Sequence, residues 1–302
     1  MLCKPRIKSK ELLIFESLNS RMNLEQKYVQ HYTNLKKGYE GEVLFDSYIE
    51  KLQCNCLILH DLLLEKNNTV FQIDSLMISQ DRIYFYEVKN YEGNYFYESG
   101  KLFKKPNLEI MDPLIQLKRS ESLLRQLIHS LDIHLQIEPF IVFVNPAFTL
   151  YQAPDNKSLI FPTQIKNHIH RLNTAPSKIE ERHRKLAKRL LSMHISDSPE
   201  NKLPNYHYDK LQKGLICPNC RAFIETIGKR KYVCTLCNHE DLLDNAVLDS
   251  IKEFSILFPD EKITTKIIYD WCRIVPERRI RNILLKHFTK VGHHRWSYYI
   301  YK

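Results

Sequence analysis

Three charged residues inside apolar segments are the first candidates for chemistry in this sequence. Residues 82–90 read RIYFYEVKN, and the alternation of a β-strand places Glu87 and Lys89 on the same face. A third charge, Asp74, interrupts the apolar run FQIDSLMIS at 71–79. A buried charge is costly unless it is paired, so Glu87 and Lys89 need partners.

Only the residues SQD (79–81) separate the strands expected at 70–78 and 82–89, so we expect a hairpin that brings Asp74 close to Glu87. Two neighbouring carboxylates repel unless a cation lies between them, and oxygen ligands suit a hard cation such as Mg²⁺ or Mn²⁺. Lys89 would then stabilise charge on a phosphate or orient an attacking water. The alternative is a buried Glu87–Lys89 ion pair with Asp74 turned to solvent.

The elements that position these residues indicate a mixed α/β domain over residues 38–172. Helical spacing of apolar residues predicts a helix before the strands, and Asp112 followed by Pro113 is typical of the start of another. The expected elements are a helix at 41–52, strands at 56–64, 70–78, 82–89, 94–98 and 101–104, a helix beginning after Asp112, and a wholly apolar central strand at 139–144.

Four segments in this order resemble the nuclease-related domain family, NERD, of the PD-(D/E)XK nuclease superfamily. They are KKGYEGE (36–42), FQIDSLMIS (71–79), IYFYEVKNYEGN (83–94) and DPLIQLKRS (112–120). The resemblance covers about residues 36–150. It implies a restriction-endonuclease-like core, in which helices flank a mixed sheet, and a Mg²⁺- or Mn²⁺-dependent nuclease that hydrolyses DNA.

By position, the resemblance implies that Asp74 and Glu87 hold the catalytic metal and that Lys89 is the catalytic lysine. Glu42 matches the acid on the first helix, and Gln116 matches the glutamine on the later helix. Each of these two has an ordinary alternative, Glu42 as a solvated helix residue and Gln116 as a partner of nearby backbone. Ile73 stands where the superfamily signature has a proline before the aspartate, although that proline is often absent.

Four of the eight cysteines form two close pairs, CPNC at 217–220 and CTLC at 234–237. In a chain with no secretory signal this spacing indicates metal rather than disulfides. Four thiolates close a tetrahedral zinc site, so we expect a structural Zn²⁺ and no chemistry there. The predicted ligands of this zinc ribbon, placed at 209–241, are Cys217, Cys220, Cys234 and Cys237. Two roles stay open: the ribbon could contact nucleic acid or protein, or its zinc could only stabilise a small domain.

The formal charge of +10 is concentrated in two segments. Residues 165–194 hold eight Lys/Arg against two Glu, and residues 276–302 hold seven against one. A helix, a short turn, a basic helix and an aromatic strand predict a winged-helix-like α+β tail at 242–302. Arg278, Arg281 and Lys286 would then contact DNA, although a small helical packing domain with a basic exterior would show the same pattern.

Five segments are therefore expected: an N-terminal helical segment (1–37), the nuclease-like domain (38–172), a basic helix and linker (173–208, with the linker at 196–208), the zinc ribbon, and the tail. The sequence contains no long apolar run, which favours a cytoplasmic protein with no membrane partner. DNA is the expected partner. A non-catalytic DNA-binding protein, or a protein-interaction adaptor on a nuclease fold, is the alternative function.

Overall fold

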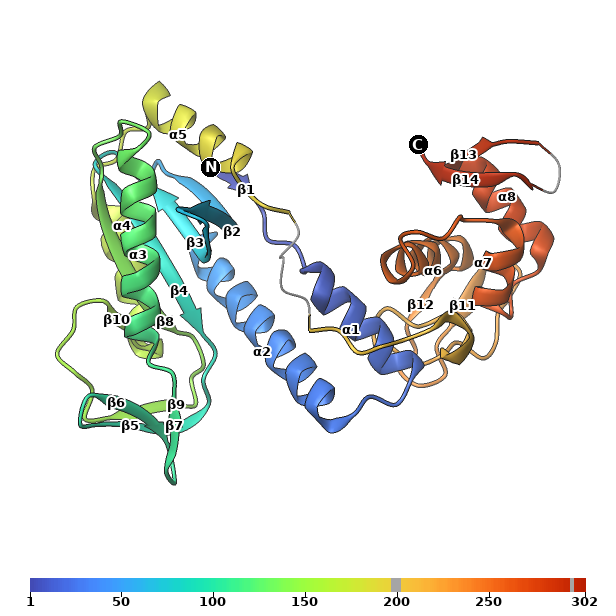
Figure 1. The fold of residues 1–302 in the computed structure, drawn as a ribbon, viewed down its shortest axis with the longest axis horizontal. Coiled ribbons are helices and arrows are strands. Elements are labelled where there is room, and N and C mark those ends of the chain that lie inside the picture. The colour runs from blue at the N-terminus through green and yellow to red at the C-terminus, as the bar shows by residue number, and fades with distance from the viewer. Residues whose placement is uncertain (197–201, 294–295) are drawn as a thin grey trace. The chain divides into compact units, whose positions relative to one another are not determined.

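The structure is a computed structural model that describes residues 1–196, 202–293 and 296–302 (Figure 1). The chain forms two compact units, each assembled from separate segments. The first unit contains Met1–Lys8 and Asn34–Glu200, and the second contains Ser9–Thr33 and Asn201–Lys302. The expected boundary at 37/38 lies inside a single helix, α2 (Gln26–Ile49), and residues 197–201 of the expected linker lie outside the described residues.

A six-stranded mixed sheet forms the centre of the first unit, in the order β1-β2-β3-β4-β8-β10. Strands β2, β3 and β4 are antiparallel neighbours, whereas β1, β8 and β10 each join the sheet in parallel. These strands are β1 (Leu2–Lys4), β2 (Leu57–Lys66), β3 (Thr69–Ile78), β4 (Arg82–Lys89), β8 (Gln136–Phe143) and β10 (Leu159–Ile160). The expected hairpin between β3 and β4 is confirmed.

Helices cover both faces of this sheet, which makes the unit a three-layer mixed α/β structure. One face packs against α3 (Pro113–His129) and α5 (Glu181–Ser192) through apolar residues of both helices. The other face packs against the second half of α2 and against α4 (Ile165–Thr174). Strand β8 lies between β4 and β10, and its last three residues, Ile141–Phe143, are buried on both sides, as the apolar run at 139–144 predicts.

Residues 2–4 form a strand, although the sequence predicts a helical N-terminal segment at 1–37. Pro5 cannot continue a ladder or donate a hydrogen bond, so the strand ends there. The Met1 amine donates to the backbone oxygen of Cys56 at 2.5 Å, and Lys4 Nζ donates to the backbone oxygens of His60 and Asp61. The N-terminus is thereby fixed to β2.

A smaller four-stranded sheet follows the large one, in the order β7-β6-β5-β9 (Figure 1). Strands β5 and β6 form the expected hairpin, and β9 pairs with β5 in parallel. The strands are β5 (Gly93–Glu98), β6 (Lys101–Lys104), β7 (Leu108–Ile110) and β9 (Phe148–Tyr151). We call this element the accessory sheet.

The second unit has one apolar core, which contains residues from both the cysteine-rich segment and the C-terminal helices. Helix α1 also packs there through Ile14 and Leu18. The elements of this unit are α1 (Lys10–Arg21), β11 (Lys231–Val233), β12 (Glu240–Leu242), α6 (Leu243–Leu257), α7 (Thr265–Cys272), α8 (Glu277–His287), β13 (Phe288–Val291) and β14 (Tyr298–Tyr301). The expected ribbon and tail thus share a core instead of forming two separate ones.

Arg21, at the end of α1, is a fully buried cation in this core. Its guanidinium donates to the backbone oxygens of Gln212 and Gly214 and to the Glu253 carboxylate, and it lies 4.0 Å from the ring centre of Trp271.

Within the described residues, no helix has the length and apolarity that a membrane span requires.

Candidate functional site

Asp74 and Glu87 lie next to each other on paired strands, and both are buried. The antiparallel β3–β4 ladder pairs Ser75 with Tyr86. Asp74 and Glu87 are the next residues along the two strands, on the same side of this pair. Only 7% of Asp74 and 3% of Glu87 are exposed, which excludes the alternative with Asp74 turned to solvent. Asp74 Oδ2 accepts a hydrogen bond of 2.7 Å from the backbone N–H of Val88, and this contact fixes the Asp74 carboxylate beside β4.

Asp74 also lies where the side-chain alternation of β3 shifts by one residue. Phe71 and Ile73 belong to the same core cluster as Leu76 and Ile78, although strict alternation would place the two pairs on opposite faces. Strand β2 shifts at the matching position, Asp61, whose φ of 52° is in the left-handed region. The two strands therefore change phase together, without a slip in register.

Lys89 connects the two acids to helix α3. Its Nζ donates to Glu87 Oε1 at 2.7 Å and to Gln116 Oε1 at 3.1 Å. Burial disfavours the ammonium, but the Glu87 carboxylate, with contributions from Tyr91 and Asp74, outweighs that effect and raises the pKa of Lys89. The lysine is therefore charged, and the amide of Gln116 orients it.

Helix α2 brings Glu42 to the same site because Gly41 permits a close approach. A Cβ at position 41 would lie 2.5 Å from the Cβ of Asn90, the residue after Lys89. Asn90 Nδ2 donates to the backbone oxygen of Lys37 at 2.8 Å and so ties the end of β4 to α2. The side chain of Glu42 is only 19% exposed, so it is not an ordinary solvated helix residue.

Arg6, which the sequence analysis did not single out, holds this arrangement from the N-terminal segment. It donates to both carboxylate oxygens of Asp46 at 2.8 and 3.1 Å and to Glu42 Oε2 at 2.5 Å. A further hydrogen bond of 2.7 Å reaches the backbone oxygen of Asp74. With 3% of its side chain exposed, Arg6 is a buried cation that joins β1 to α2 and to the bend in β3.

The electrostatics of the three acids favour a bound cation. Burial, with the negative charges of Glu87 and Glu42 nearby, raises the pKa of Asp74 well above its usual value. Burial also raises the pKa of Glu42 to about 7, although Arg6 opposes the shift. A divalent cation would relieve this repulsion, and an all-oxygen donor set fits Mg²⁺ or Mn²⁺.

The carboxylates of Glu42 and Glu87 face Arg6 and Lys89 in the structure. In the described part of the chain, four cysteines form the one group of His, Cys, Asp or Glu side chains with at least three ligand atoms within 4.8 Å of one another. Metal binding at the acidic site therefore requires these side chains to rotate toward a common point.

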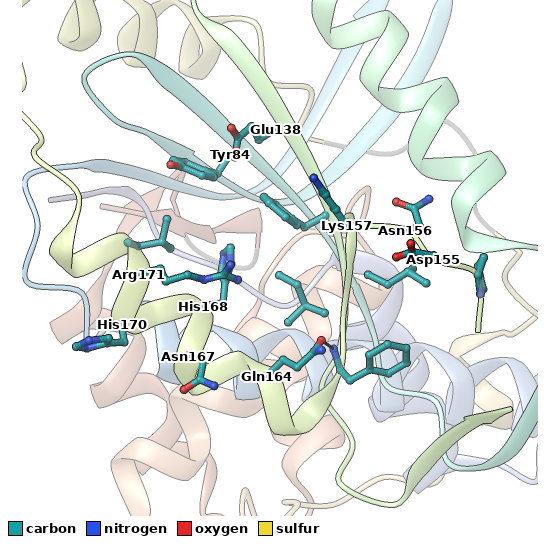
Figure 2. Close-up of a pocket in the computed structure, with 16 residues that line it drawn as sticks. Tyr84, Glu138, Asp155, Asn156, Lys157, Gln164, Asn167, His168, His170 and Arg171 are labelled. Carbon is teal, nitrogen blue, oxygen red and sulfur yellow. Dashed lines mark hydrogen bonds between the residues drawn. The ribbon is translucent and has the colours of Figure 1, made fainter. Parts of the chain in front are cut away.

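A cavity of about 1080 Å³ is shown in Figure 2. Its lining residues Tyr84 and Phe140 pack on the face of the large sheet opposite the one that carries Glu87 and Lys89. Tyr84 and Phe140 line it from β4 and β8, and Lys157 lies in a loop on its other side. His168 of α4 lies in its wall, where its Nε2 is 2.9 Å from the Tyr86 hydroxyl. Burial, together with nearby Arg171, lowers the pKa of His168 to about 4. No sequence pattern pointed to this cavity.

The cysteine cluster has a metal-site geometry built from two equivalent turns. In each turn the first cysteine N–H donates to the backbone oxygen five residues later and its oxygen accepts from the N–H four residues later. Arg221 and Asn238 occupy the equivalent positions after the two pairs, with φ of 64° and 57°. The four sulfurs of Cys217, Cys220, Cys234 and Cys237 lie within 4.8 Å of one another. Such a set suits tetrahedral zinc.

Helix α8 carries the predicted basic residues on its exposed side. Ile280, Ile283 and Leu284 are buried in the core of the second unit. Arg278, Arg281 and Lys286 are exposed. Arg279 differs from them, because its guanidinium donates to Asp244 Oδ1 at 2.8 Å.

Residues 37–144 match the family model of NERD, the nuclease-related domain. The match runs from the middle of α2 to the end of β8 and includes Glu42, Asp74, Glu87, Lys89 and Gln116. No curated protein and no solved structure matches the chain.

Proposed function

We propose that this chain, whose residues 37–144 form a nuclease-related domain, is a nuclease that uses Mg²⁺ or Mn²⁺ to hydrolyse DNA phosphodiester bonds. The observation that carries the proposal is the buried pair Asp74 and Glu87 with Lys89 beside it, on neighbouring strands of the matched domain. We assign the large sheet and its helices to the PD-(D/E)XK core, because these acids and the lysine occupy the positions of that motif.

Each residue of the candidate site would have a separate role in hydrolysis. Asp74 and Glu87 would hold the cation, with Glu42 as a third acid. When bound, the cation would lower the pKa of a water and neutralise charge that develops on the phosphate. Lys89 places a charged ammonium beside Glu87 and would stabilise the developing negative charge or orient the attacking water. Gln116 would keep the ammonium in place through its hydrogen bond.

The second unit would assist by binding DNA. Helices α6, α7 and α8 are followed by the antiparallel pair β13–β14, and Ile263, between α6 and α7, bridges to Tyr299 of β14. This order of elements supports a winged-helix assignment, with α8 as the helix that enters the major groove. Exposed Arg278, Arg281 and Lys286 would then contact phosphates. The cysteine cluster would hold structural Zn²⁺ in the core of the same unit.

A cleavage assay tests the proposal directly. Purified protein is incubated with labelled duplex and single-stranded DNA in Mg²⁺, in Mn²⁺ and in excess EDTA. We expect cleavage with either metal and none with EDTA. If the protein binds DNA but does not cleave it in any metal, the alternative of a DNA-binding protein on a nuclease fold replaces the nuclease.

A further inference from the structure

The accessory sheet displays one row of aromatic side chains on the face that is not packed on the core. Phe96 of β5 pairs directly with Phe103 of β6 and with Tyr151 of β9. Residues paired across strands point to the same face, so three neighbouring strands place three rings side by side. We call these three rings the aromatic row.

The opposite face of the accessory sheet is its core face. Tyr95, Leu102 and Leu150 alternate with the aromatic row along the same three strands, and they pack into the core cluster of the first unit. Within the described residues, Phe96, Phe103 and Tyr151 are in none of the three core clusters or the side chains packed on them. Phe96 and Phe103 are half-buried, and Tyr151 is 45% exposed. The row is thus not explained by the packing of the unit.

The geometry of the row suits stacking of flat ligands. The rings of Phe96 and Phe103 are nearly parallel, with centroids 5.3 Å apart and an interplanar angle of 17°. The Tyr151 hydroxyl is 3.4 Å from Asn94 Oδ1. Strands lie about 4.8 Å apart, so rings on three adjacent strands extend over roughly 10 Å, enough for two or three bases.

One lysine supplies positive charge at the row: Lys105 Nζ lies 4.0 Å from the centre of the Tyr151 ring. The charge of Lys101, beside the row, is balanced by Glu109, which pairs with Phe103 and lies 3.0 Å from the Lys101 Nζ. Aromatic rings with adjacent cations are the usual surface for single-stranded nucleic acid, because bases stack on the rings and phosphates pair with the cations. The bases of a duplex are already stacked on each other and cannot use such a surface.

The accessory sheet is also continuous with the candidate catalytic site. Strand β5 begins at Gly93, four residues after Lys89. The Tyr97 hydroxyl donates to Asp112 Oδ1 at 2.7 Å, and Asp112 caps α3, the helix that carries Gln116. These contacts belong to the core face of the accessory sheet, which packs toward the candidate site, and the aromatic row lies on the other face of the same sheet.

We infer that the aromatic row binds an unpaired segment of nucleic acid, so that the substrate includes a single-stranded region. The statement about the substrate rests on the proposed nuclease function, but binding to the aromatic row can be tested without catalysis.

The test uses full-length protein carrying Lys89→Ala, without divalent metal, so that the probe is bound but not cut. Fluorescence anisotropy measures binding of a short oligothymidylate over a range of salt. Phe96→Leu or Tyr151→Leu should weaken binding roughly 5- to 150-fold, the factor that corresponds to about 1–3 kcal/mol of stacking per base. The dependence of log K on log[salt] should keep its slope, because no phosphate contact is lost.

Two further variants separate stacking from charge and from general damage. Lys105→Gln should flatten the salt slope by about 0.7, the value for one phosphate contact to a single strand. Leu108→Ala removes an exposed apolar side chain that pairs with Lys104, off the aromatic row, and should leave affinity unchanged. Thermal melting must match that of the parent for each variant.

The outcomes distinguish this inference from the proposed function. If both aromatic variants bind oligothymidylate like the parent, the inference is wrong, even where the wild type cleaves DNA in a Lys89-dependent way. If the aromatic variants lose single-strand binding but the wild type never cleaves, the aromatic row is confirmed as a binding surface and the nuclease proposal is wrong.

Discussion

Lys89 Nζ lies 2.7 Å from Glu87 Oε1, and both residues are on one face of β4, two positions apart. If Lys89 stabilises charge at the phosphate, Lys89→Ala should lower the cleavage rate about 10²- to 10³-fold, as the loss of one preorganised donor does. Metal binding should persist, because the acids remain. Lys66→Ala, at the end of β2, is the control and should cleave normally. Unimpaired cleavage by Lys89→Ala would remove the lysine from the mechanism.

Asp74 should be needed for the metal itself. Asp74→Ala is expected to lose both cleavage and Mn²⁺ binding, measured by titration calorimetry, since it removes a carboxylate from the buried site. The same change also removes a carboxyl group whose pKa is raised by burial and by repulsion from Glu87 and Glu42, so thermal stability without metal should not fall sharply. A variant that keeps Mn²⁺ affinity would show that the metal lies elsewhere.

The buried ion pairs of Arg6 with α2 should contribute much more to stability than an exposed ion pair on that helix. Arg6→Met leaves the buried carboxylates of Asp46 and Glu42 without their cationic partner and should lower the free energy of unfolding by about 3–5 kcal/mol. Lys36→Met breaks the exposed pair with Glu40 and should cost at most about 1 kcal/mol. Urea unfolding of the two variants gives the comparison, and equal costs would mean that the Arg6 network is not structural.

The cysteine site should hold one zinc per chain, and zinc should support the whole second unit. Cys217 and Cys234 are buried in the core that also contains Trp271 and Ile280. Cys217→Ser or Cys234→Ser should therefore lose the metal and also destabilise the C-terminal helices, whereas the first unit should still melt separately. Metal analysis and calorimetry check both points; freshly reduced protein without zinc would contradict the assignment.

The exposed cations of α8 should contribute to DNA affinity through phosphates. Replacing Arg278, Arg281 and Lys286 with Gln should flatten the plot of log K against log[salt] for duplex DNA by roughly 2–3 units. Cleavage at saturating DNA should persist. If affinity and slope are both unchanged, α8 is not a DNA-contacting helix, and the exposed Lys and Arg of α5 become the stronger candidate.

His168 should make stability depend on pH. Its pKa is lowered to about 4 in the folded protein and is about 6.5 when unfolded, so its contribution is complete above pH 6.5 and is lost as the pH falls toward 4. The change amounts to about 3 kcal/mol over that window. Urea unfolding of His168→Gln should show a flatter pH dependence than wild type between these values; parallel curves would rule out His168 as the titrating group.

The central part of the site could be predicted from the sequence because its signals are local. The two-residue period of β4 places Glu87 and Lys89 on one face, and the three-residue turn before it brings Asp74 opposite. Gln116 follows from a helix start that Asp112 and Pro113 mark. Each of these inferences depends on residues close together in the chain.

Arg6 could not be predicted in the same way. Its partners lie 36 to 68 residues away, and nothing in the sequence MLCKPR marks a buried cation. The assignment of α1 to the second unit could not be predicted for the same reason. The helical pattern of α1 does not indicate that Arg21, at its end, contacts Trp271 and Glu253. The aromatic row likewise required the pairing of β9 with β5, which is not a hairpin.

The path of the chain between the two units has a consequence for the order of folding. Helix α1 is synthesised before β2 and the later strands, yet Ile14 and Leu18 lie in a core whose other fully buried members begin at Leu211, and Arg21 donates to Gln212 and Glu253. While the chain is being synthesised, the first unit has all of its strands before those partners exist. The side chains of Ile14 and Leu18 therefore stay uncovered during this period, and binding by a chaperone or aggregation competes with completion of the second unit.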